Sequence, residues 1–516
     1  MQKLNVGMAV AGLATLVLGA CSSSTSATQG PSHRVLTYAY ARQWNNLDPS
    51  ESDAAENDLF VNVYETLATY DPKTQQAKPL LATSWTHNSD GTEWTFHLRA
   101  NVKFQDGTDF DANAVKFTIQ RTAKLNQGAG YIWAPVTEID VVDPLTVTLK
   151  LSQPQPMDLI AASGWGAFMM SPKSDDQDPS WFNQGNGVGT GPYMWSSYHP
   201  GQSAILKPFN GYWGGWKSDQ FTDVVYNFSP DATTREQLLR SNQAVMALNV
   251  SRPDLASLSK SFSVHPIDTL DAAEVILNVK RFPTNNVLVR KALLYAFPED
   301  QIAQTVFQQY APKIRDFAPN GLWGTDLPLT GYTLDLTMAK QLLAQAGYPN
   351  GGLTVEYTST TDAYPEEERV GELWKASLAQ IGVTLNVKSI TFNENVQIST
   401  QPDPNAAPNA SILEWVPNIP SLQDYLFNSF GTQAGFHKAY YSNAQFDTLI
   451  NDGGVLSATD RGAASAKFQQ ASQLILDQAV GLPMVDNADI WVAQRNISGF
   501  VATPFGLLLH ELHVTS

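Results

Sequence analysis

Several residue types that could support catalysis or metal binding are present, but their spacing matches no catalytic or metal-binding motif. The glycine-rich segment that ends at Gly191 resembles a phosphate-binding loop, yet it lacks the Lys-Ser/Thr pair of a P-loop and continues into Pro192 and Tyr193. Its glycines are better suited to a tight turn into a strand. His510 and His513 are three residues apart, but the further ligands that a metal would need are missing. We therefore expect no metal site and no cofactor.

Acidic residues are abundant without forming a recognisable catalytic pair. With 49 Asp and Glu residues, close carboxylate pairs arise by chance and give no specific support to a glycosidase. The Gly-x-Ser-x-Gly motif of serine hydrolases is absent. The triplet Glu366–Glu368 is most simply a solvated first helical turn, favoured by the helix dipole. These acidic residues therefore give no specific support to an enzyme.

Tryptophan is the residue type whose placement suggests ligand binding. Four of the 13 tryptophans fall in segments expected to be loops or strand ends, namely Trp44, Trp133, Trp165 and Trp415. Most tryptophans in a chain of this size belong to the structural core, whereas loop tryptophans that line a cleft can stack on a ligand. Both interpretations remain open for these four residues.

Composition limits the class of protein further. The chain has 516 residues, enough for one to three domains, and 23 Phe and 18 Tyr exclude a chain that is disordered throughout. Its net charge of −17 would repel nucleic acid. No apolar run inside the body reaches the roughly 18 residues of a membrane-spanning helix. We expect an acidic, aromatic-rich globular protein without a nucleic-acid partner.

The first 33 residues are expected to direct export and anchoring. Residues 1–20 have one charge and a short apolar core, as in a signal peptide. They end in Leu18-Gly19-Ala20-Cys21, which resembles a bacterial lipobox, and Cys21 is the only cysteine. That resemblance implies cleavage before Cys21, lipidation of its thiol and attachment to the cell membrane. Residues 21–33 are a polar, flexible tether.

The first part of the body contains an alternating pattern typical of antiparallel strands. Strands are expected at 35–40, 93–99 and 145–151, and in the last two apolar and polar side chains alternate. A helical pattern covers 57–67, and Asp111 is a candidate N-cap for the helix that follows it. These elements predict a compact antiparallel unit with a helix.

The later part follows a different pattern. Asp335 is expected to cap a helix that stops at Gly347. Strands at 353–357 and 383–387 flank a helix at 366–381. Strand, helix, strand in this order favours a βαβ unit and a parallel sheet.

Together these segments allow a family resemblance to be stated. The chain resembles the extracellular solute-binding proteins of ABC importers, family 5, the peptide/nickel class. The resemblance runs from about residue 35 to about 500, and its most specific stretch is the strand, Phe-x-Asp-Gly turn and helix of residues 94–117. Weaker matches follow in the family's order, at 47–49, 64–67, 80–85, 189–193, Asn278, 289–296, 346–349 and 381–383. Their shared order carries the resemblance.

The resemblance implies a two-lobed α/β fold of the periplasmic-binding-protein type (type II, cluster C), with an extra antiparallel subdomain in the N-terminal lobe. The expected boundaries are 34–272 for the N-terminal lobe with its inserted subdomain at about 75–195, 273–485 for the C-terminal lobe, and 486–516 for a segment that returns to complete the N-terminal lobe. The ligand would lie between the lobes.

Peptide-binding members of the family hold the peptide's amino terminus with the aspartate of a Gly-Trp-x-x-Asp motif. The corresponding residues here are Glu414, Trp415 and Asn418, so the glycine and the aspartate are both replaced. Asp424 or Glu414 could take over that charge, or the ligand could be uncharged. The remaining residues expected at the ligand come from the end of the first strand and from the subdomain, namely Gln43, Trp44, Asn45, Tyr131 and Trp133.

The function that the resemblance implies is that of a lipid-anchored, exported binding protein that captures a solute and delivers it to permease and ATPase subunits. An oligopeptide or dipeptide is the first expected ligand. An oligosaccharide, nickel or haem is the alternative within the family, and a secreted hydrolase or a ligand sensor is the alternative outside it. We expect a monomer that faces the periplasm or the extracellular space.

Overall fold

The computed structural model describes residues 34–42, 44–52, 57–174, 177–324, 329–360, 364, 366–434 and 439–515. Residues 1–33 with Cys21, as well as Gln43, lie outside the described residues, so the expectations placed on them stay predictions. Across the described part of the chain, no helix combines the length and the apolar character needed to cross a membrane.

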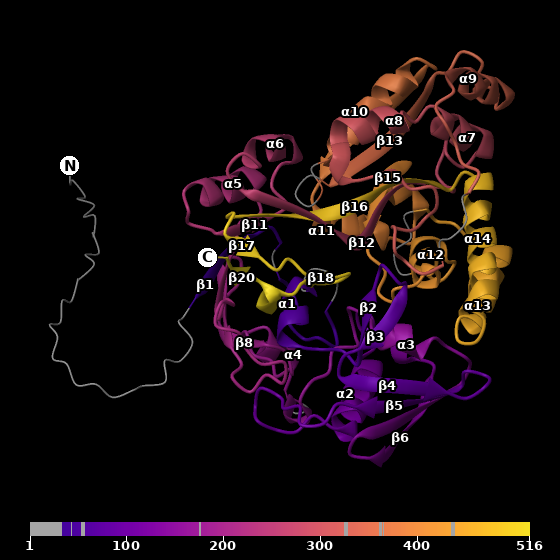
Figure 1. Ribbon diagram of the computed structural model, residues 1–516. Coiled ribbons are helices and arrows are strands. Elements are labelled where there is room, and N and C mark those ends of the chain that lie inside the picture. Colours follow the sequence, from indigo (N-terminus) through magenta and orange to yellow (C-terminus); the bar gives the residue numbers. More distant parts are fainter. Residues whose placement is uncertain are drawn as a thin grey trace, which may run out of the picture. The chain divides into compact units, whose positions relative to one another are not determined.

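The main structural element is a ten-stranded mixed sheet, whose strands lie in the order β14-β13-β15-β12-β16-β11-β1-β10-β9-β8 (Figure 1). We call β11-β1-β10-β9-β8 the first half of the sheet and β14-β13-β15-β12-β16 the second half. The strands are β1 (Val35–Tyr40), β8 (Tyr193–His199), β9 (Ser203–Pro208), β10 (Asp223–Phe228), β11 (Met246–Leu248), β12 (Ser263–Leu277), β13 (Leu353–Thr360), β14 (Val383–Ile390), β15 (Ala410–Trp415) and β16 (Gly481–Ala493).

Two long antiparallel strands, β12 and β16, run through the centre of this sheet. Their register shifts between Asp268 and Asp271, and Leu270 in between has a φ of 55°, which non-glycine residues rarely adopt. The carboxyl-terminal end of β16 also pairs with β11, and this pairing joins the second half of the sheet to the first. The bulge therefore lies where the two halves meet.

The first half of the sheet has a core of aromatic side chains. Tyr38, Tyr40 and Tyr226 are fully or almost fully buried, and their rings pack on one another. Trp491 of β16 donates a hydrogen bond to the Tyr38 hydroxyl at 2.8 Å. The segment after β16 returns to the first half, where Leu509 donates its amide to Asn62 of α1 (Asn57–Val63).

Helix α1 is shorter than the 57–67 that the apolar pattern predicts. The Val63 carbonyl accepts the Gly191 amide at 3.1 Å and the Gln105 amide group at 2.9 Å. The nearby Gly189 lies so close that a Cβ there would be 2.1 Å from the same carbonyl oxygen. The glycine-rich segment thus packs on the end of α1, and long-range partners replace the next helical turn.

A separate four-stranded antiparallel sheet follows in the chain, with strand order β4-β5-β7-β6. Trp94 and Phe96 of β5 are buried and Glu93 and His97 are exposed, which confirms the predicted period of two. Asp111 caps α2 as predicted, because its carboxylate accepts the amides of Asn113 and Ala114. The elements are β4 (Ala82–His87), β5 (Glu93–Leu98), α2 (Ala112–Leu125), η2 (Gly130–Trp133), β6 (Val136–Asp143), β7 (Thr146–Leu151), α3 (Met157–Ile160), η3 (Pro172–Ser174) and α4 (Pro179–Phe182).

The second half of the sheet confirms the predicted parallel unit. β13 and β14 pair in parallel, and α10 (Glu366–Ala379), which connects them, packs against both. Asp335 caps α9 (Leu336–Gln345) through the amides of Thr337 and Met338. The prediction of a solvated turn at Glu366–Glu368 is wrong for Glu367, whose side chain is 3% exposed and accepts the Thr360 amide.

The remaining elements complete the two halves. They are β2 (Ala68–Asp71), β3 (Gln76–Pro79), α5 (Ala232–Arg240), η4 (Arg252–Asp254), α6 (Leu255–Leu258), α7 (Val287–Tyr295), α8 (Glu299–Ile302), η5 (Ala303–Phe307), η6 (Gln308–Tyr310), α11 (Phe392–Ser399), η7 (Pro404–Ala406), α12 (Leu422–Phe430), α13 (Ala444–Leu456), α14 (Arg461–Asp477), β17 (Ile497–Ser498), β18 (Ala502–Thr503), β19 (Gly506–Leu507), η8 (Leu509–Glu511) and β20 (His513–Val514).

Candidate functional site

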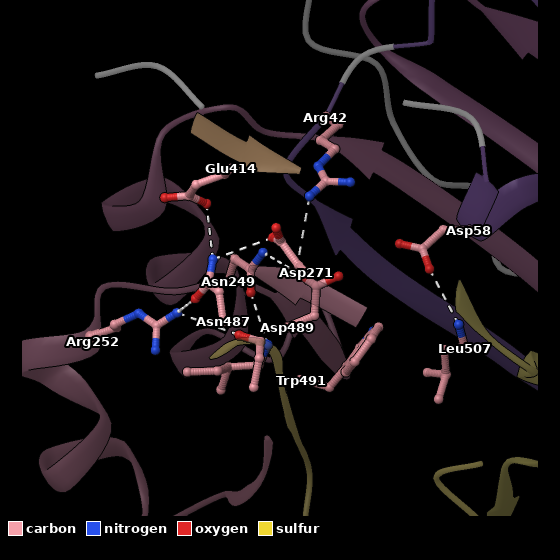
Figure 2. A network of polar contacts seen from close by, with 12 residues as sticks. Arg42, Asp58, Asn249, Arg252, Asp271, Glu414, Asn487, Asp489, Trp491 and Leu507 are labelled. Carbon is pink, nitrogen blue, oxygen red and sulfur yellow. Dashed lines mark hydrogen bonds and ion pairs between the residues drawn. The ribbon is translucent and has the colours of Figure 1, made fainter. Parts of the chain in front are cut away.

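A network of charged side chains surrounds the point where β12 and β16 connect the two halves of the sheet (Figure 2). Asp271 of β12 lies opposite Asn487 of β16. Because directly paired residues point to the same face, their side chains meet, and Asp489 two residues on shares that face. We call this group the strand-crossing network; it consists of Arg42, Asn249, Arg252, Asp271, Glu414, Asn487 and Asp489.

Asn487 holds the centre of the strand-crossing network. Its side-chain oxygen accepts a hydrogen bond from Arg252. Its amide nitrogen donates to Glu414 Oε2 at 2.9 Å and to Asp271 Oδ2 at 3.4 Å. Figure 2 shows these side chains converging on Asn487 from three directions. The neutral amide group of Asn487 therefore separates the Arg252 guanidinium from the two carboxylates.

The other end of the network holds Asp489. Its Oδ1 accepts a hydrogen bond from Asn249 at 2.7 Å and lies 4.0 Å from the Arg42 guanidinium. Arg42 follows β1, so it brings a positive charge from the first half of the sheet. The Arg42 side chain is 37% exposed and that of Asp489 15%, which leaves Arg42 as the solvent-facing member of this pair.

Negative charge exceeds positive charge in this region. Arg252 is also paired with Glu366 at 3.1 Å, so four carboxylates face two guanidinium groups. Burial, followed by the charge of Asp489, raises the pKa of Asp271 to about 7. Burial, followed by the charge of Asp271, raises the pKa of Glu414 well above its usual value. The negative charges are thus held close together at a free-energy cost.

A second polar cluster joins the antiparallel unit to the second half of the sheet. The Tyr131 hydroxyl of η2 donates to Asp424 Oδ1 of α12 at 2.5 Å. The same hydroxyl oxygen accepts the side-chain amides of Asn418 at 2.8 Å and Asn428 at 3.1 Å. We call these four residues the bridging node. It links two regions that are nearly 300 residues apart in sequence.

Asp424 has a donor for each of its carboxylate oxygens. Oδ1 accepts the Tyr131 hydroxyl, and Oδ2 accepts the backbone amides of Asn418 at 2.6 Å and Ile419 at 3.2 Å. Burial raises its pKa to about 6, although these hydrogen bonds oppose the shift. Asp424 therefore holds the loop after Trp415 in place, and its oxygens are committed to the protein.

The other tryptophan and asparagine positions expected at the ligand are scattered. Trp415 is half-buried at the end of β15, which keeps part of its ring accessible. Trp133 is 1% exposed and donates to the Gly166 carbonyl, and Trp44 is 4% exposed within the aromatic core of the first half. Asn45 is exposed. Contact of these residues with a ligand stays a prediction.

Two further contacts link β2 and α3 to later parts of the chain. The Tyr70 hydroxyl donates to the Gly321 carbonyl at 2.8 Å. Arg461 of α14 pairs with Asp158 of α3 at 2.5 Å, and its guanidinium carbon lies 5.3 Å from the centre of the Trp323 ring. A cavity of about 350 Å³ lies beside this contact, lined by Trp323, Leu422 and Arg461 among others.

Sequence reasoning did not identify most of the strand-crossing network. Asp271, Asn487 and Asp489 lie in long strands that also contain the buried carboxyl groups of Glu274 and Asp486, and Arg42 directly precedes a predicted site residue. Several polar residues within otherwise apolar strands could have signalled a buried polar site. Their proximity could not be inferred, because it depends on the register between β12 and β16.

Comparison with solved structures supports a two-lobed binding-protein fold. A dipeptide-binding protein of Pseudoalteromonas sp. SM9913 in complex with Met-Leu superposes with a TM-score of 0.81 at 22% identity, over 93% of this chain and 100% of that chain. The DppA protein of Helicobacter pylori in complex with the peptide STSA gives a TM-score of 0.79 at 22% identity, over 93% and 98%. The chain thus has the two-lobed binding-protein fold expected from the sequence, while the expected lobe boundaries stay predictions.

Comparison with curated sequences gives matches along nearly the whole chain. Heme-binding protein A of Haemophilus influenzae is 26% identical over 98% of both chains. Glutathione-binding protein GsiB of Escherichia coli is 25% identical over 96% of both. The model of the bacterial extracellular solute-binding proteins, family 5 (middle region), matches residues 76–437. This protein therefore belongs to family 5 of the bacterial extracellular solute-binding proteins.

Proposed function

We propose that this protein captures a peptide on the outer side of the cell membrane and delivers it, chemically unchanged, to the permease and ATPase subunits of an ABC importer. The observation that carries the proposal is the join between the sheet halves. It runs through β12 and β16 with an irregular register at Leu270, and polar side chains from both halves meet beside it. Such a join permits two lobes to open and close around a solute.

Closure would be driven by the ligand. A solute that contacts both lobes favours the closed form by its differential affinity for that form. Tyr131, Asn418 and Asp424 already connect regions from both sides of the join. These contacts would form when the lobes approach, while the ligand adds the remaining free energy of closure. No bond of the ligand needs to be broken.

Peptide is our first choice of ligand because of the chemistry around Trp415. The ring lies at the end of β15, and the following loop is fixed by Asp424. An extended peptide could add to an exposed strand end by backbone hydrogen bonds, with Trp415 packing on a side chain. Among the relatives, GsiB is named for glutathione, and two similar folds hold peptides. Trp415 is the ligand contact we propose first, and the bridging-node residues Asn418 and Tyr131 position the loop that follows it.

The experiment is to purify the protein under mild conditions, denature it and identify the released solutes by mass spectrometry. A ladder of peptides is the expected result. Release of hexose oligomers or haem would show that the ligand belongs to another class. X-ray scattering before and after ligand addition should show a smaller radius of gyration with the ligand. Superimposable scattering curves at saturation, or a chemically altered ligand, would overturn the capture mechanism.

Anchoring at the membrane rests on Cys21, which we propose as the lipidated residue. The test is Cys21→Ser expressed in the native host. The wild-type protein should partition with membranes, and the variant should appear in the soluble fraction because no acyl chain can be attached. Equal partitioning of both proteins would remove Cys21 from this role.

A further inference from the structure

The replacement of the family's amine-binding aspartate by Asn418 raises the question of where this protein keeps the corresponding charge. Glu414 and Asp424 are the two nearby carboxylates in the sequence. They belong to two different polar clusters, and their hydrogen-bond partners separate them.

Asp424 is not available to a ligand. Its two oxygens accept three donors from Tyr131, Asn418 and Ile419. A ligand ammonium would have to displace one of these donors. The displaced donor would then be left buried without an acceptor, which opposes binding.

Glu414 belongs to the strand-crossing network, where the carboxylates have fewer hydrogen-bond donors than Asp424 has. Its neighbour Asp271 is 7% exposed, and its Oδ1 has no hydrogen-bond donor among the described residues. Within the described part of the chain, Asp271 Oδ2 receives only the 3.4 Å contact from Asn487. Among the described residues Asp58, Asp158 and Asp486 also have a buried carboxylate oxygen without a donor, but Asp271 alone shares the Asn487 amide with Glu414, so that a cation there would meet two carboxylates.

The positive groups nearby do not fill that position. Arg252 donates to Glu366, Asn487 and the Ala488 carbonyl, while its buried Nη1 has no hydrogen-bond partner among the described residues, and Arg42 lies 4.0 Å from Asp489 at the other end of the network. The negative charges of Asp486 and Glu367 add to the field around Asp271 and Glu414, whereas the positive charges of Arg42 and Arg252 oppose it. A cation that reaches Asp271 and Glu414 would therefore be attracted and would gain charge-assisted hydrogen bonds.

We propose that Asp271 and Glu414 form the subsite for the positively charged end of the ligand, an ammonium or guanidinium group, in place of an aspartate at position 418. This inference rests on the proposed function and deepens it, because it specifies the ligand as an organic cation at that end. Asn487 positions both carboxylates, and Arg252 holds Asn487.

The test uses the mature protein and an enzymatic casein hydrolysate, one half of which has been acetylated so that all its amines are neutral. Each pool is incubated with the protein, free solutes are removed by gel filtration, and the retained peptides are quantified by mass spectrometry. Wild-type protein should retain the free-amine pool at least about tenfold better, the range expected for a charge-assisted contact. Glu414→Gln and Asp271→Asn should each largely abolish this preference.

Glu138→Gln is the matched control, because it removes one carboxylate charge at an exposed site in the antiparallel sheet, where Glu138 is 56% exposed. It should behave as wild type. Unfolding of each variant by urea establishes that it is folded; Glu414→Gln, at a half-buried side chain, provides a second variant should Asp271→Asn fail to fold.

The outcomes separate the two proposals. Equal retention of both pools by wild-type protein would overturn the cationic subsite and leave the peptide function standing. Retention of neither pool would reject peptide as the ligand; the subsite is then tested by thermal unfolding with arginine, putrescine and neutral 1,4-butanediol. Stabilisation by the two cations alone, lost in both variants, supports the subsite, and the absence of stabilisation overturns it.

Discussion

The bridging node and the strand-crossing network both gather buried oxygen atoms, but donors saturate the first and not the second. In the bridging node, Asp424 accepts one hydroxyl and two backbone amides. In the strand-crossing network, Asp271 has one long contact and one oxygen to which none of the described residues donates. The comparison suggests that a satisfied cluster positions the chain, whereas an unsatisfied one is ready for a ligand.

The largest expected effect comes from breaking the saturated cluster. Asp424→Ala should lower the free energy of unfolding by about 3 kcal/mol, because the Tyr131 hydroxyl and two backbone amides lose their acceptor. Urea denaturation measures this change. Asn418→Ala removes a single hydrogen bond and should cost about 1 kcal/mol. If the two variants were equally stable, the view of Asp424 as the organiser of the node would be wrong.

Removing the ring between the two clusters should affect binding rather than folding. Trp415→Ala should weaken affinity for the co-purified peptide by about 1–3 kcal/mol, as expected for a central aromatic anchor. Isothermal titration calorimetry gives the affinity. The control is Trp374→Phe, because Trp374 is fully buried in α10 and donates to the Leu293 carbonyl. It should lower stability and leave affinity unchanged, and unaltered binding by folded Trp415→Ala would remove that ring from the site.

The unsaturated cluster should appear in the pH dependence of stability. Because burial and the charge of Asp489 raise the pKa of Asp271 to about 7, the folded state binds a proton more tightly than the unfolded state. Between about pH 4 and pH 7 this carboxyl should make stability fall as pH rises, by at most ~1.4 kcal/mol per pH unit. Above the folded-state pKa of Asp271, this carboxyl no longer makes the free energy of unfolding depend on pH.

Asp271→Asn isolates this contribution. The variant should show a flatter stability profile and a gain in stability at pH 8 relative to wild type, since the carboxylate charge is no longer buried. Urea midpoints at pH 5 and pH 8 measure both effects. A loss of stability at pH 8 would mean that the Asp271 charge is compensated in the free protein.

The smallest effect concerns the contact between α14 and α3. Arg461→Ala removes the pair with Asp158 and the contact with the Trp323 ring, while the Arg461 side chain is 33% exposed. Partly exposed pairs of this kind contribute about 0.5–1 kcal/mol. The change should shift ligand affinity two- to fivefold, measured by calorimetry. A larger shift in ligand affinity would mean that this contact contributes to binding as strongly as the two polar clusters.

Local elements were largely predictable from the sequence, because they depend on nearest neighbours. Asp111 and Asp335 cap their helices as predicted, and the alternation around Trp94 identifies β5. The prediction failed where distant partners intervene. Val63 ends α1 early because Gln105 and Gly191 take its carbonyl, and Glu367 is buried because the Thr360 amide needs an acceptor.

The candidate site was predictable only in part. The resemblance to the family identified Trp415 and Asn418, and the structure brings Asn418 together with Tyr131. The choice between Asp424 and Glu414 stayed open, because sequence shows which carboxylates are present but not which donors surround them. Asp271, Asn487 and Asp489 were missed for the same reason.

By itself the sequence determined the strand and helix periods, the caps and the family, since these are carried by residue types at short and fixed spacing. Only the tertiary structure decided which charges share a face. The pairing of Asp271 with Asn487 spans 216 residues. A shift of one residue in that pairing would move either side chain to the opposite face of the sheet.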